Sequence, residues 1–498
     1  MRTLLTLFLA AIPWAIVSAQ DDDPPDPPEL ERIGGSVHRY KDGRIESIWL
    51  ADTPVNDSDI EVLRGYPEIR RLYLNRTKIT DRGLAVLRPM ARLTTLDLSG
   101  TAITGAGLAS LPPMPELVVL QLNQTDADDR AARFVGRCVA LTSVWLDGTH
   151  VGDEFLRGIT GLKRIGGLSL GKTAVGDAGL AHLANLASID FLILNGTAVG
   201  DAGLAYLAKL TRMSTLDLAG TKISDAGLAH LAGMRRMWRL DLSRTAVGDA
   251  GMVHLAKMTR LETLDLADTA VGDGGIFQFA GFQKLYELNL SRTNVGDAGL
   301  ARLNRHQELW RLNLAGTKAG DGGMAHLAAL RKLRELDLSG TGVGNVGLGR
   351  LAASKSLTLL HLERTAVDDA GLVHCVRFPK LDALHLSGTA IGDAGLAHLS
   401  GLEKLKVLEL SATRITDAGL EDLKNLGSLE TLDLSDTAIT DAGLERLAED
   451  NNLTSLMVLD LTNTRTTDEA VRRIAPRFAN GDEWIVTRDR YRPRRNIL

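Results

Sequence analysis

The sequence predicts an α/β solenoid with a parallel β-sheet on its concave face and helices on its convex face. A threonine recurs every 24 residues from Thr53 to Thr437, and once more at Thr464 after a three-residue insertion. Leucines before each threonine alternate as in a strand with one buried face, and the Gly-Leu-x-x-Leu spacing after it is helical. Neither short element can bury its apolar side alone, so the repeats must stack side by side.

The repeat template is L-x-x-L-x-L-x-x-T-x-I/V-x-D-x-G-L-x-x-L, as residues 93–103 and 413–423 illustrate. An aspartate stands four residues after the threonine in sixteen of the eighteen repeats, and Asn345 and Gly105 are the exceptions. Because the helical half begins there, we expect this aspartate to be an N-cap. The template glycines, two residues after the aspartate or directly before the threonine, are interpreted as turn residues.

The repeated threonine has a predicted mechanical role. The chain turns from strand toward helix at this point, which leaves inward-facing backbone groups that need hydrogen-bond partners. We expect each hydroxyl to bridge to the next repeat and so form a ladder of threonines. The repeats of Thr125 and Thr149 depart most from the template, because Ala131 and Phe155 replace the usual glycine. Such departures mark places where function or a local bulge is expected.

Residues 45–477 resemble leucine-rich-repeat proteins of the ribonuclease-inhibitor-like superfold, whose shape is a horseshoe. The T-x-I-T-D-x-G-L signature is most similar to the subclass found beside F-box domains, which usually has cysteine where this chain has threonine, and to bacterial Gly-Leu-Ala-rich repeats. The resemblance implies a binding fold of about eighteen repeats and names no ligand, because this fold carries many unrelated binding functions. The chain shows no F-box, so we do not expect a ubiquitin-ligase adaptor.

The two ends of the chain differ from the repeats. Residues 1–19 are interpreted as a signal peptide, with Arg2 before an apolar run and cleavage after Ala19, and the alternative is a retained membrane anchor. Residues 20–44 form an acidic, proline-rich spacer and N-terminal cap, whose segment 21–29 we expect to contain neither helix nor strand. Residues 478–498 are interpreted as a C-terminal cap, with Trp484 and Ile485 over the last leucine layer, followed by an arginine-rich tail.

Composition excludes several classes of function. The 498 residues carry a formal net charge of −5, so neither a nucleic-acid partner nor an anionic membrane surface is expected. After cleavage of the signal peptide we expect no integral membrane association. Only Cys138 and Cys375 are present, at template positions that predict buried free thiols. The sequence shows no nucleotide loop, catalytic triad or cofactor motif, so we expect no cofactor and no enzymatic activity.

The candidate binding residues point away from the core on the concave strands, six and four positions before each threonine. The four-before column begins with aromatic residues and becomes acidic, while the six-before column alternates bases and acids. Trp238, Tyr286 and Trp310 stand beside these columns and are expected to frame the surface. The candidates are Trp49, Tyr73, Trp145, Asp217, Asp241, Asp265 and Asp337 in the four-before column and Arg239, Glu287, Arg311 and Glu335 in the six-before column.

The columns predict binding of a protein or peptide with a basic surface on the concave face, and the signal peptide predicts an extracytoplasmic location. We expect the protein to be a monomer. The alternative is a scaffold or spacer of the cell envelope without a single ligand, in which the aspartates only keep the sheet soluble. His361, His385 and Glu409 occupy the four-before column in three successive strands. We interpret them as surface polar residues rather than a metal site, and the alternative hypothesis is a shared Zn²⁺ or Ni²⁺ ion.

Overall fold

The computed structural model describes residues 25–449, 453, 455–478 and 485–487. The chain divides into two compact units, the first ending at Ala174 and the second beginning at Val175. The predicted signal peptide, Trp484 and the arginine-rich tail lie outside the described residues. Within the described ranges, no helix is both long and apolar enough to cross a membrane.

The first unit is a sheet of short strands, each followed by a short helix or 3-10 helix. Strand β1 pairs antiparallel with β2, and β2 to β7 pair in parallel with their neighbours in chain order. Its strands are β1 (Ser36–Arg39), β2 (Ile45–Trp49), β3 (Arg71–Tyr73), β4 (Thr95–Asp97), β5 (Val119–Gln121), β6 (Ser143–Trp145) and β7 (Gly167–Ser169). Its helical elements are α1 (Pro28–Glu31), η1 (Asp59–Gly65), η2 (Gly83–Leu87), α2 (Gly105–Ala109), η3 (Asp129–Ala131), α3 (Ala132–Val135) and α4 (Asp153–Gly158).

The second unit repeats the same pattern, and its strands pair in parallel and in chain order from β8 to β20. Its strands are β8 (Phe191–Ile193), β9 (Thr215–Asp217), β10 (Arg239–Asp241), β11 (Thr263–Asp265), β12 (Glu287–Asn289), β13 (Arg311–Asn313), β14 (Glu335–Asp337), β15 (Leu359–His361), β16 (Ala383–His385), β17 (Val407–Glu409), β18 (Thr431–Asp433), β19 (Val458–Asp460) and β20 (Ile485–Thr487). Its α-helices are α5 (Asp177–Leu183), α6 (Asp201–Leu207), α7 (Asp225–Leu228), α8 (Asp249–Leu255), α9 (Asp273–Ile276), α10 (Asp297–Leu303), α11 (Met324–Leu327), α12 (Asn345–Leu351), α13 (Asp369–Leu372), α14 (Asp393–Leu396), α15 (Asp441–Glu449) and α16 (Asp468–Phe478), and its 3-10 helices are η4 (Ala229–Leu231), η5 (Phe277–Gly281), η6 (Cys375–Arg377), η7 (Ala397–Leu399) and η8 (Gly419–Asn425).

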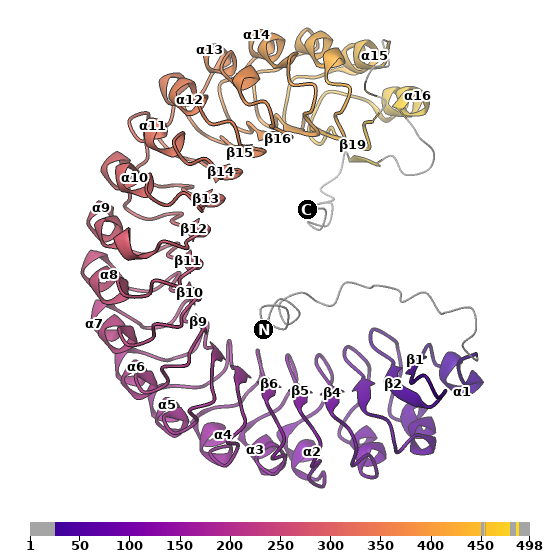
Figure 1. The fold of residues 1–498 in the computed structure, drawn as a ribbon. Helices are drawn as coiled ribbons and strands as arrows, with labels where there is room; N and C mark the ends of the chain where they lie inside the picture. Colours follow the sequence, from indigo (N-terminus) through magenta and orange to yellow (C-terminus); the bar gives the residue numbers. More distant parts are fainter. Residues whose placement is uncertain (1–24, 450–452, 454, 479–484, 488–498) are drawn as a thin grey trace. The chain divides into compact units, whose positions relative to one another are not determined.

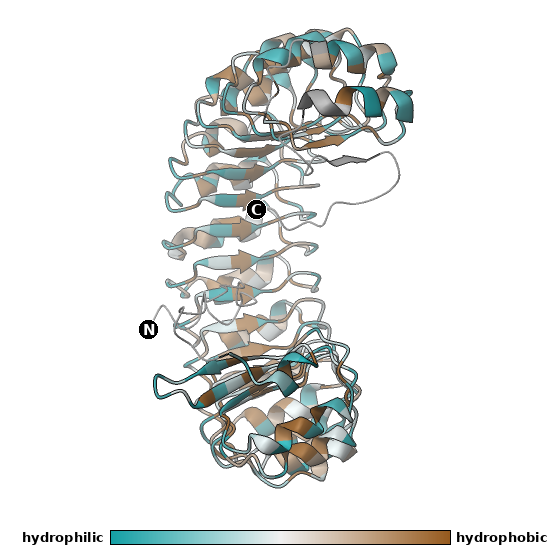
Figure 2. Cartoon of the chain, turned by 90° about the vertical axis from the view of Figure 1, so that its right-hand side faces the viewer, coloured by the Kyte–Doolittle hydropathy of each residue, from teal (hydrophilic) through white to brown (hydrophobic). Residues whose placement is uncertain are grey.

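The core lies between strands and helices. In the second unit, β9 to β16 line the inner side and α7 to α14 the outer side (Figure 1), which confirms the predicted placement of the sheet and the helices. Hydrophilic and hydrophobic residues follow one another within these strands (Figure 2), because alternate side chains face solvent and core. Each fully buried large apolar side chain contributes roughly 1.5–3 kcal/mol to the free energy of folding. In the repeat of Thr221 the apolar residues with no exposed surface are Met213, Leu216, Leu218, Ile223, Leu228, Leu231 and Met234.

The two cysteines are free and buried, as predicted from their template positions. Burial raises the pKa of the Cys138 thiol, and it raises the pKa of the Cys375 thiol to about 12. Both thiols are therefore protonated at neutral pH and serve as small apolar side chains of the core.

The segment before the first repeat is more ordered than predicted. We expected residues 21–29 to contain no helix, which is wrong at their C-terminal end, because α1 begins at Pro28. Proline is favoured in the first turn of a helix, where its missing N–H needs no partner. Leu30 is completely buried, and the Tyr66 hydroxyl donates to Glu29 Oε1 at 2.5 Å. The segment therefore belongs to the N-terminal cap.

The recurring threonine acts within its own repeat, which corrects the predicted threonine ladder. In all eighteen repeats its hydroxyl donates to the backbone carbonyl three residues earlier, at 2.5–2.8 Å. The residue before each threonine has φ between +52° and +70°. The hydroxyl therefore closes a tight left-handed turn at the end of the strand, and the glycines directly before threonine are turn residues, as predicted.

The aspartate four residues after the threonine provides the link between repeats. It was predicted to be an N-cap, which is wrong: in most repeats it is the first residue of the helix. Its Oδ1 accepts a hydrogen bond from a backbone N–H of the next repeat, at 2.6–2.8 Å. The amide oxygen of Asn345 accepts the corresponding N–H of Asp368 at 3.1 Å. The ladder thus consists of aspartates.

The glycine two residues after this aspartate makes room for the ladder. A Cβ at Gly203 would lie 2.5 Å from Asp177 Oδ1, and one at Gly251 would lie 2.5 Å from Asp225 Oδ1. These glycines therefore permit close approach, and their interpretation as turn residues is wrong. Phe155 shows that a side chain can be accommodated, since its N–H donates to Asp129 Oδ1 at 3.2 Å.

At one contact between neighbouring repeats, both the ladder aspartate and the glycine that faces it are replaced. Gly105 stands where the ladder aspartate is usual, and Ala131 in the next repeat stands where the glycine is usual. The Asp128 carboxylate occupies the space beside Gly105, where an added Cβ would lie 2.0 Å from Asp128 Oδ1. The departure at Ala131 was predicted to mark function or a bulge. It is instead a packing change, in which the Asp128 carboxylate fills the space beside Gly105.

Thr245→Val tests the turn hydrogen bond. The Thr245 side chain is 7% exposed and donates to Leu242 O at 2.6 Å, so the variant leaves a carbonyl without its partner. We expect the free energy of unfolding in urea to fall by about 1–3 kcal/mol. Ser243→Ala is the control, because alanine stands at the same template position in residues 219 and 267. Its effect should stay below about 0.5 kcal/mol, and equal losses for the two variants would contradict the assignment.

A double-mutant cycle on Asp225 and Gly251 tests the contact between repeats. Gly251→Ala is expected to lower stability by about 1–3 kcal/mol, because its methyl group meets the Asp225 carboxylate. Asp225→Gly loses the hydrogen bond from the Gly248 N–H. The double variant copies the natural pair Gly105 and Ala131, so its loss should be smaller than the sum of the single losses. Additive losses in urea denaturation would exclude the contact.

Candidate functional site

A shallow depression of about 320 Å³ lies on the inner face of the second unit, over β10 to β15. We call it the acidic depression. Its charged lining consists of Arg239, Asp241, Asp265, Glu287, Arg311, Glu335 and Asp337, with His361 at one end. Five carboxylates against two guanidinium groups give this lining a formal charge of −3 with His361 neutral. The structure thus brings seven of the sequence-predicted candidates together.

The remaining charged candidate lies directly beside the depression. Asp217 is on β9, in register with Asp241 on β10 and hence with Asp265 on β11. Neighbouring parallel strands lie about 4.8 Å apart, so these carboxylates form a row at that spacing. Burial alternates as predicted on β10 and β11, where the leucine between the two partly exposed residues is buried, whereas on β9 both Thr215 and Leu216 are buried.

The aspartates of this row have a structural role that the sequence interpretation missed. Oδ1 of Asp241 accepts the backbone N–H of Ser243 at 2.9 Å, which is an Asx turn at the end of the strand. Asn289 and Asn313 make the same turn with their amide oxygens. The same bond is made by Asp97, Asp217, Asp265, Asp337, Asp433 and Asp460. Solubility alone therefore does not account for the row.

Burial and mutual repulsion act on the charge of this row. Desolvation raises the pKa of Asp265, and the neighbouring charge of Asp241 raises it further. Hydrogen bonds from the Ala267 N–H and the Asn289 side chain oppose this rise without cancelling it. The folded protein therefore holds negative charge here at some free-energy cost, and a bound cationic group would lower that cost.

The six-before column contains both paired and unpaired charges. Arg311 Nε lies 2.5 Å from Glu335 Oε2, and the two side chains are 54% and 23% exposed. An ion pair this exposed contributes little to stability. Arg239 forms no ion pair within the described part of the chain, and Glu287 Oε2 accepts only a long 3.5 Å hydrogen bond from the Thr263 hydroxyl. The column therefore offers a ligand one positive charge, on Arg239, and one negative charge, on Glu287.

Aromatic side chains flank the start of these strands, as predicted. The rings of Tyr286 and Trp310 stack at 6.5 Å with an interplanar angle of 16°, and all three aromatics, Trp238 included, are partly exposed. The Arg311 guanidinium lies 5.6 Å from the centre of the Trp310 ring, within cation–π range. These aromatic residues directly precede β10, β12 and β13, which line the acidic depression, but they are not themselves part of its lining.

The aromatic candidates of the first unit are not one cluster. Trp49 and Tyr73 stack at 3.8 Å on neighbouring strands, and Trp49 remains 36% exposed beside β1. Trp145 lies on β6, separated from Tyr73 by β4 and β5, whose residues in this column are Asp97 and Gln121. Trp145 is therefore separated from the stacked pair of Trp49 and Tyr73 by two strands that carry polar residues in this column.

Two family models, both described as leucine rich repeat, match parts of this chain. One matches residues 379–439, and the other matches residues 92–111, 283–303 and 329–352. No curated protein matches the sequence. These matches agree with the resemblance seen in the repeat template.

Solved structures show the same architecture at low sequence identity. A leucine-rich-repeat protein of Leptospira interrogans is 18% identical, with a TM-score of 0.57 over 80% of this chain and 96% of that one. The ectodomain of the Arabidopsis receptor kinase HAESA, in complex with an N-terminally extended IDA peptide hormone ligand, is 15% identical with a TM-score of 0.54 over 86% of this chain and 76% of that one. TLR13 in complex with ssRNA13 is 19% identical with a TM-score of 0.53 over 82% and 61%.

The fold is a leucine-rich-repeat solenoid. At identities this low the likeness extends to the fold alone, and the structures that share it include one bound to a peptide and one bound to RNA. The class of ligand must therefore be argued from the side chains of this chain.

Asp265→Asn tests the charge of the row separately from its turn. The variant keeps the Asx turn, as Asn289 and Asn313 do, and removes a charge that the folded state disfavours. The pKa of Asp265 is raised in the folded state, so ionisation of this carboxyl lowers the free energy of unfolding of the wild type. This loss of stability is absent below about pH 4 and develops as the pH rises through the folded pKa. We expect Asp265→Asn to be more stable than wild type at pH 7, with the gain disappearing on acidification.

Urea denaturation over this pH range measures the gain. Asp265→Ala is the control, because it removes both the charge and the Asx turn and should be less stable than Asp265→Asn at every pH. A gain of equal size at pH 7 and at pH 4 would contradict the linkage between charge and stability.

Proposed function

We propose that this chain is an exported, non-enzymatic binding module that receives a protein or peptide segment with basic groups in the acidic depression. The observation that carries the proposal is the convergence of five carboxylates and two guanidinium groups on five successive strands, β10 to β14, of one open face. Charge complementarity at such a face sets the choice of partner and the rate of association more than the affinity.

The charge of the depression argues against RNA and for a cationic partner. A phosphate backbone binds where lysine and arginine outnumber acids, and here acids outnumber bases. A lysine or arginine side chain would meet the outward oxygens of the aspartate row, while an acidic group of the ligand could pair with Arg239. Tyr286 and Trp310 add partly exposed aromatic area directly before β12 and β13, of the kind that anchors bound segments.

A peptide ligand also fits the shape of the face. The depression is shallow and follows the strands β10 to β15, so an extended segment can cross several repeats. The HAESA ectodomain shows that a leucine-rich-repeat array of this fold can bind a peptide hormone. We propose the same kind of use here, with the basic character of the ligand set by the residues of this chain.

The proposed location is extracytoplasmic. It rests on residues 1–19, whose Arg2, apolar run and small residues before the cleavage point are typical of a signal peptide. The regular packing of the repeats, with apolar side chains buried between strands and helices, supports a monomer that needs no partner to fold.

A scaffold without a single ligand is the second candidate. The observation that favours it is the Asx turn. The same turn is made on strands that do not line the depression, such as β4 and β18, so a role in folding accounts for an aspartate at this template position. If folding alone maintains the row, the depression needs no ligand. The two candidates differ in whether basic peptides are selected.

A peptide-display selection on the immobilised full chain tests the binding proposal. We expect enriched peptides to be basic and to bind more weakly as salt increases. The variant Asp241→Asn/Asp265→Asn/Asp337→Asn removes three charges from the depression and keeps three Asx turns. It should weaken the selected peptides by roughly tenfold or more in fluorescence anisotropy, about 1.4 kcal/mol.

The matched control is Asp97→Asn/Asp433→Asn/Asp460→Asn, which changes the net charge equally at the same template position outside the depression. It should bind selected peptides as the wild type does. Equal losses in both triple variants would show that only the overall charge matters. A selection that enriches no peptide class would favour the scaffold.

A further inference from the structure

Four side chains depart from the repeat template at adjoining positions: three lie on β15 to β17, and the fourth, Glu363, lies in the turn after β15. From Asp217 to Asp460 the four-before column is aspartate or asparagine except at His361, His385 and Glu409. The position two residues later is alanine or serine from Ala219 to Ser435, with Glu363 as the exception. In an array this uniform, neighbouring departures that face the same solvent are unexpected from template drift.

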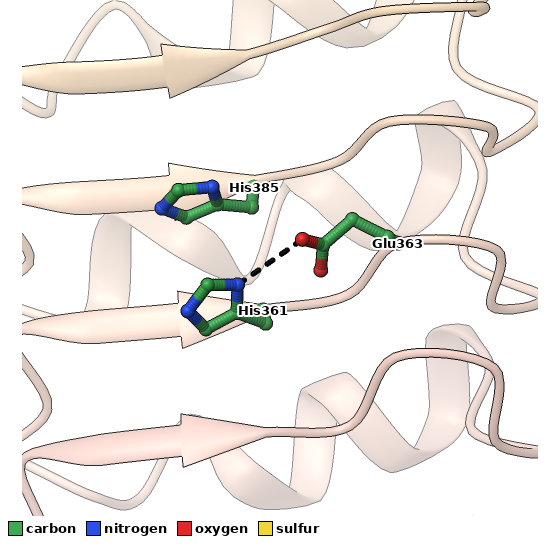
Figure 3. A group of neighbouring side chains, drawn as sticks. All are labelled: His361, Glu363 and His385. Atoms are coloured by element: carbon green, nitrogen blue, oxygen red, sulfur yellow. Dashed lines mark hydrogen bonds and ion pairs between the residues drawn. The ribbon is translucent and has the colours of Figure 1, made fainter. Parts of the chain in front are cut away.

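The four side chains form one cluster. The imidazoles of His361 and His385 stack with ring centres 4.2 Å apart and an interplanar angle of 23°. His361 Nδ1 lies 3.1 Å from Glu363 Oε1, and His385 Nδ1 lies 2.8 Å from Glu409 Oε2. Figure 3 shows the two rings one above the other, with Glu363 beside the nitrogen of His361 that faces it.

We propose that His361, Glu363 and His385 bind a divalent transition-metal ion, with Zn²⁺ the best fit. One nitrogen of each imidazole and one carboxylate oxygen lie within 4.8 Å of one another. Two imidazoles and a carboxylate are a ligand set that suits zinc, nickel or copper, whereas magnesium and calcium prefer oxygen ligands. The set revises the hypothesis drawn from the sequence, in which Glu409 held the place of Glu363.

Binding one ion requires the stacked imidazoles to turn, because a metal binds in the plane of each ring and these planes are only 23° from parallel. Two nitrogens bound to zinc at about 2.1 Å and at a tetrahedral angle are about 3.4 Å apart. The ring centres are 4.2 Å apart, and the 3.1 Å between His361 Nδ1 and Glu363 Oε1 already suits two ligands of one ion. The donor atoms already lie within 4.8 Å of one another, so rotation of the imidazoles about their side-chain bonds is the movement that metal binding requires.

Neighbouring groups hold the ligands in place. Ser339 Oγ donates to Glu363 Oε2 at 2.7 Å, which leaves Oε1 directed toward His361. Glu409 accepts from His385 and so orients that ring, in the way that a carboxylate commonly supports a metal-binding histidine. Glu409 is therefore assigned as a positioning residue.

The cluster is accessible to solvent and is surrounded by negatively charged side chains. The side chains of His361, Glu363 and His385 are 27%, 24% and 13% exposed, so an ion can enter and a fourth coordination position stays open to water or a ligand. Burial alone would lower the pKa of His361, but Glu363, Asp337 and Glu409 together raise it. These carboxylates favour a cation between them, and a proton competes with the metal.

The proposal is independent of peptide binding, although His361 also lines the acidic depression. The test is calorimetric titration of ZnCl₂ into the full chain, prepared without a histidine tag, at slightly alkaline pH. We expect one ion per chain. Each of the variants His361→Asn, His385→Asn and Glu363→Ser installs the residue found at that position in other repeats, so each should fold.

Each ligand variant should weaken zinc binding by about tenfold or more, and Glu409→Gln should weaken it while keeping one ion per chain. His254→Gln, on the outer helix α8, is the control and should bind as the wild type does. Bound zinc should also raise the melting temperature of wild type and control, but not of the ligand variants. No zinc binding by the wild type, or equal binding by ligand variants and control, would overturn the proposal.

Discussion

The hydrogen bond from one repeat to the carboxylate of the previous repeat is the constraint on which the rest of the structure depends. Asp177, for example, begins a helix of its own repeat and accepts the N–H of Gly200 in the next. Its oxygen approaches so closely that Gly203 has no room for a side chain without local adjustment. Because the same link recurs along the array, the strands stay in register and their outward residues form straight columns.

Those columns let one residue serve folding and recognition together. Asp241 uses one carboxylate oxygen to close an Asx turn, and the negative charge remains on the inner face. Asparagine at Asn289 performs the turn without the charge, so the two roles are chemically separable in this position. Burial raises the pKa of Asp265, and repetition raises it further by placing the like charge of Asp241 beside it. The electrostatics of the face thus follow from the register of the sheet.

A regular array makes its exceptions informative. The histidines on β15 and β16 replace the usual Asx residues and turn toward carboxylates of their own or the next repeat. Gly105 and Ala131 are also exceptions, but they exchange one packing contact for another and face the interior. An exception that faces solvent beside others of complementary chemistry supports a site, whereas a buried one is explained by packing.

The sequence by itself determined the repeat length, the strands, the helices and the outward direction of Asp241, Glu287 and their columns. It also identified Cys138 and Cys375 as buried, because all of these follow from the period of apolar residues. Only the tertiary structure decided that the threonine acts locally while the aspartate links repeats, and that Glu363 joins His361. The periodicity can be read from the residue types along the chain. The hydrogen-bond partner of a short polar side chain depends instead on the direction in which it leaves the backbone, and that direction is set by the packing of the repeats.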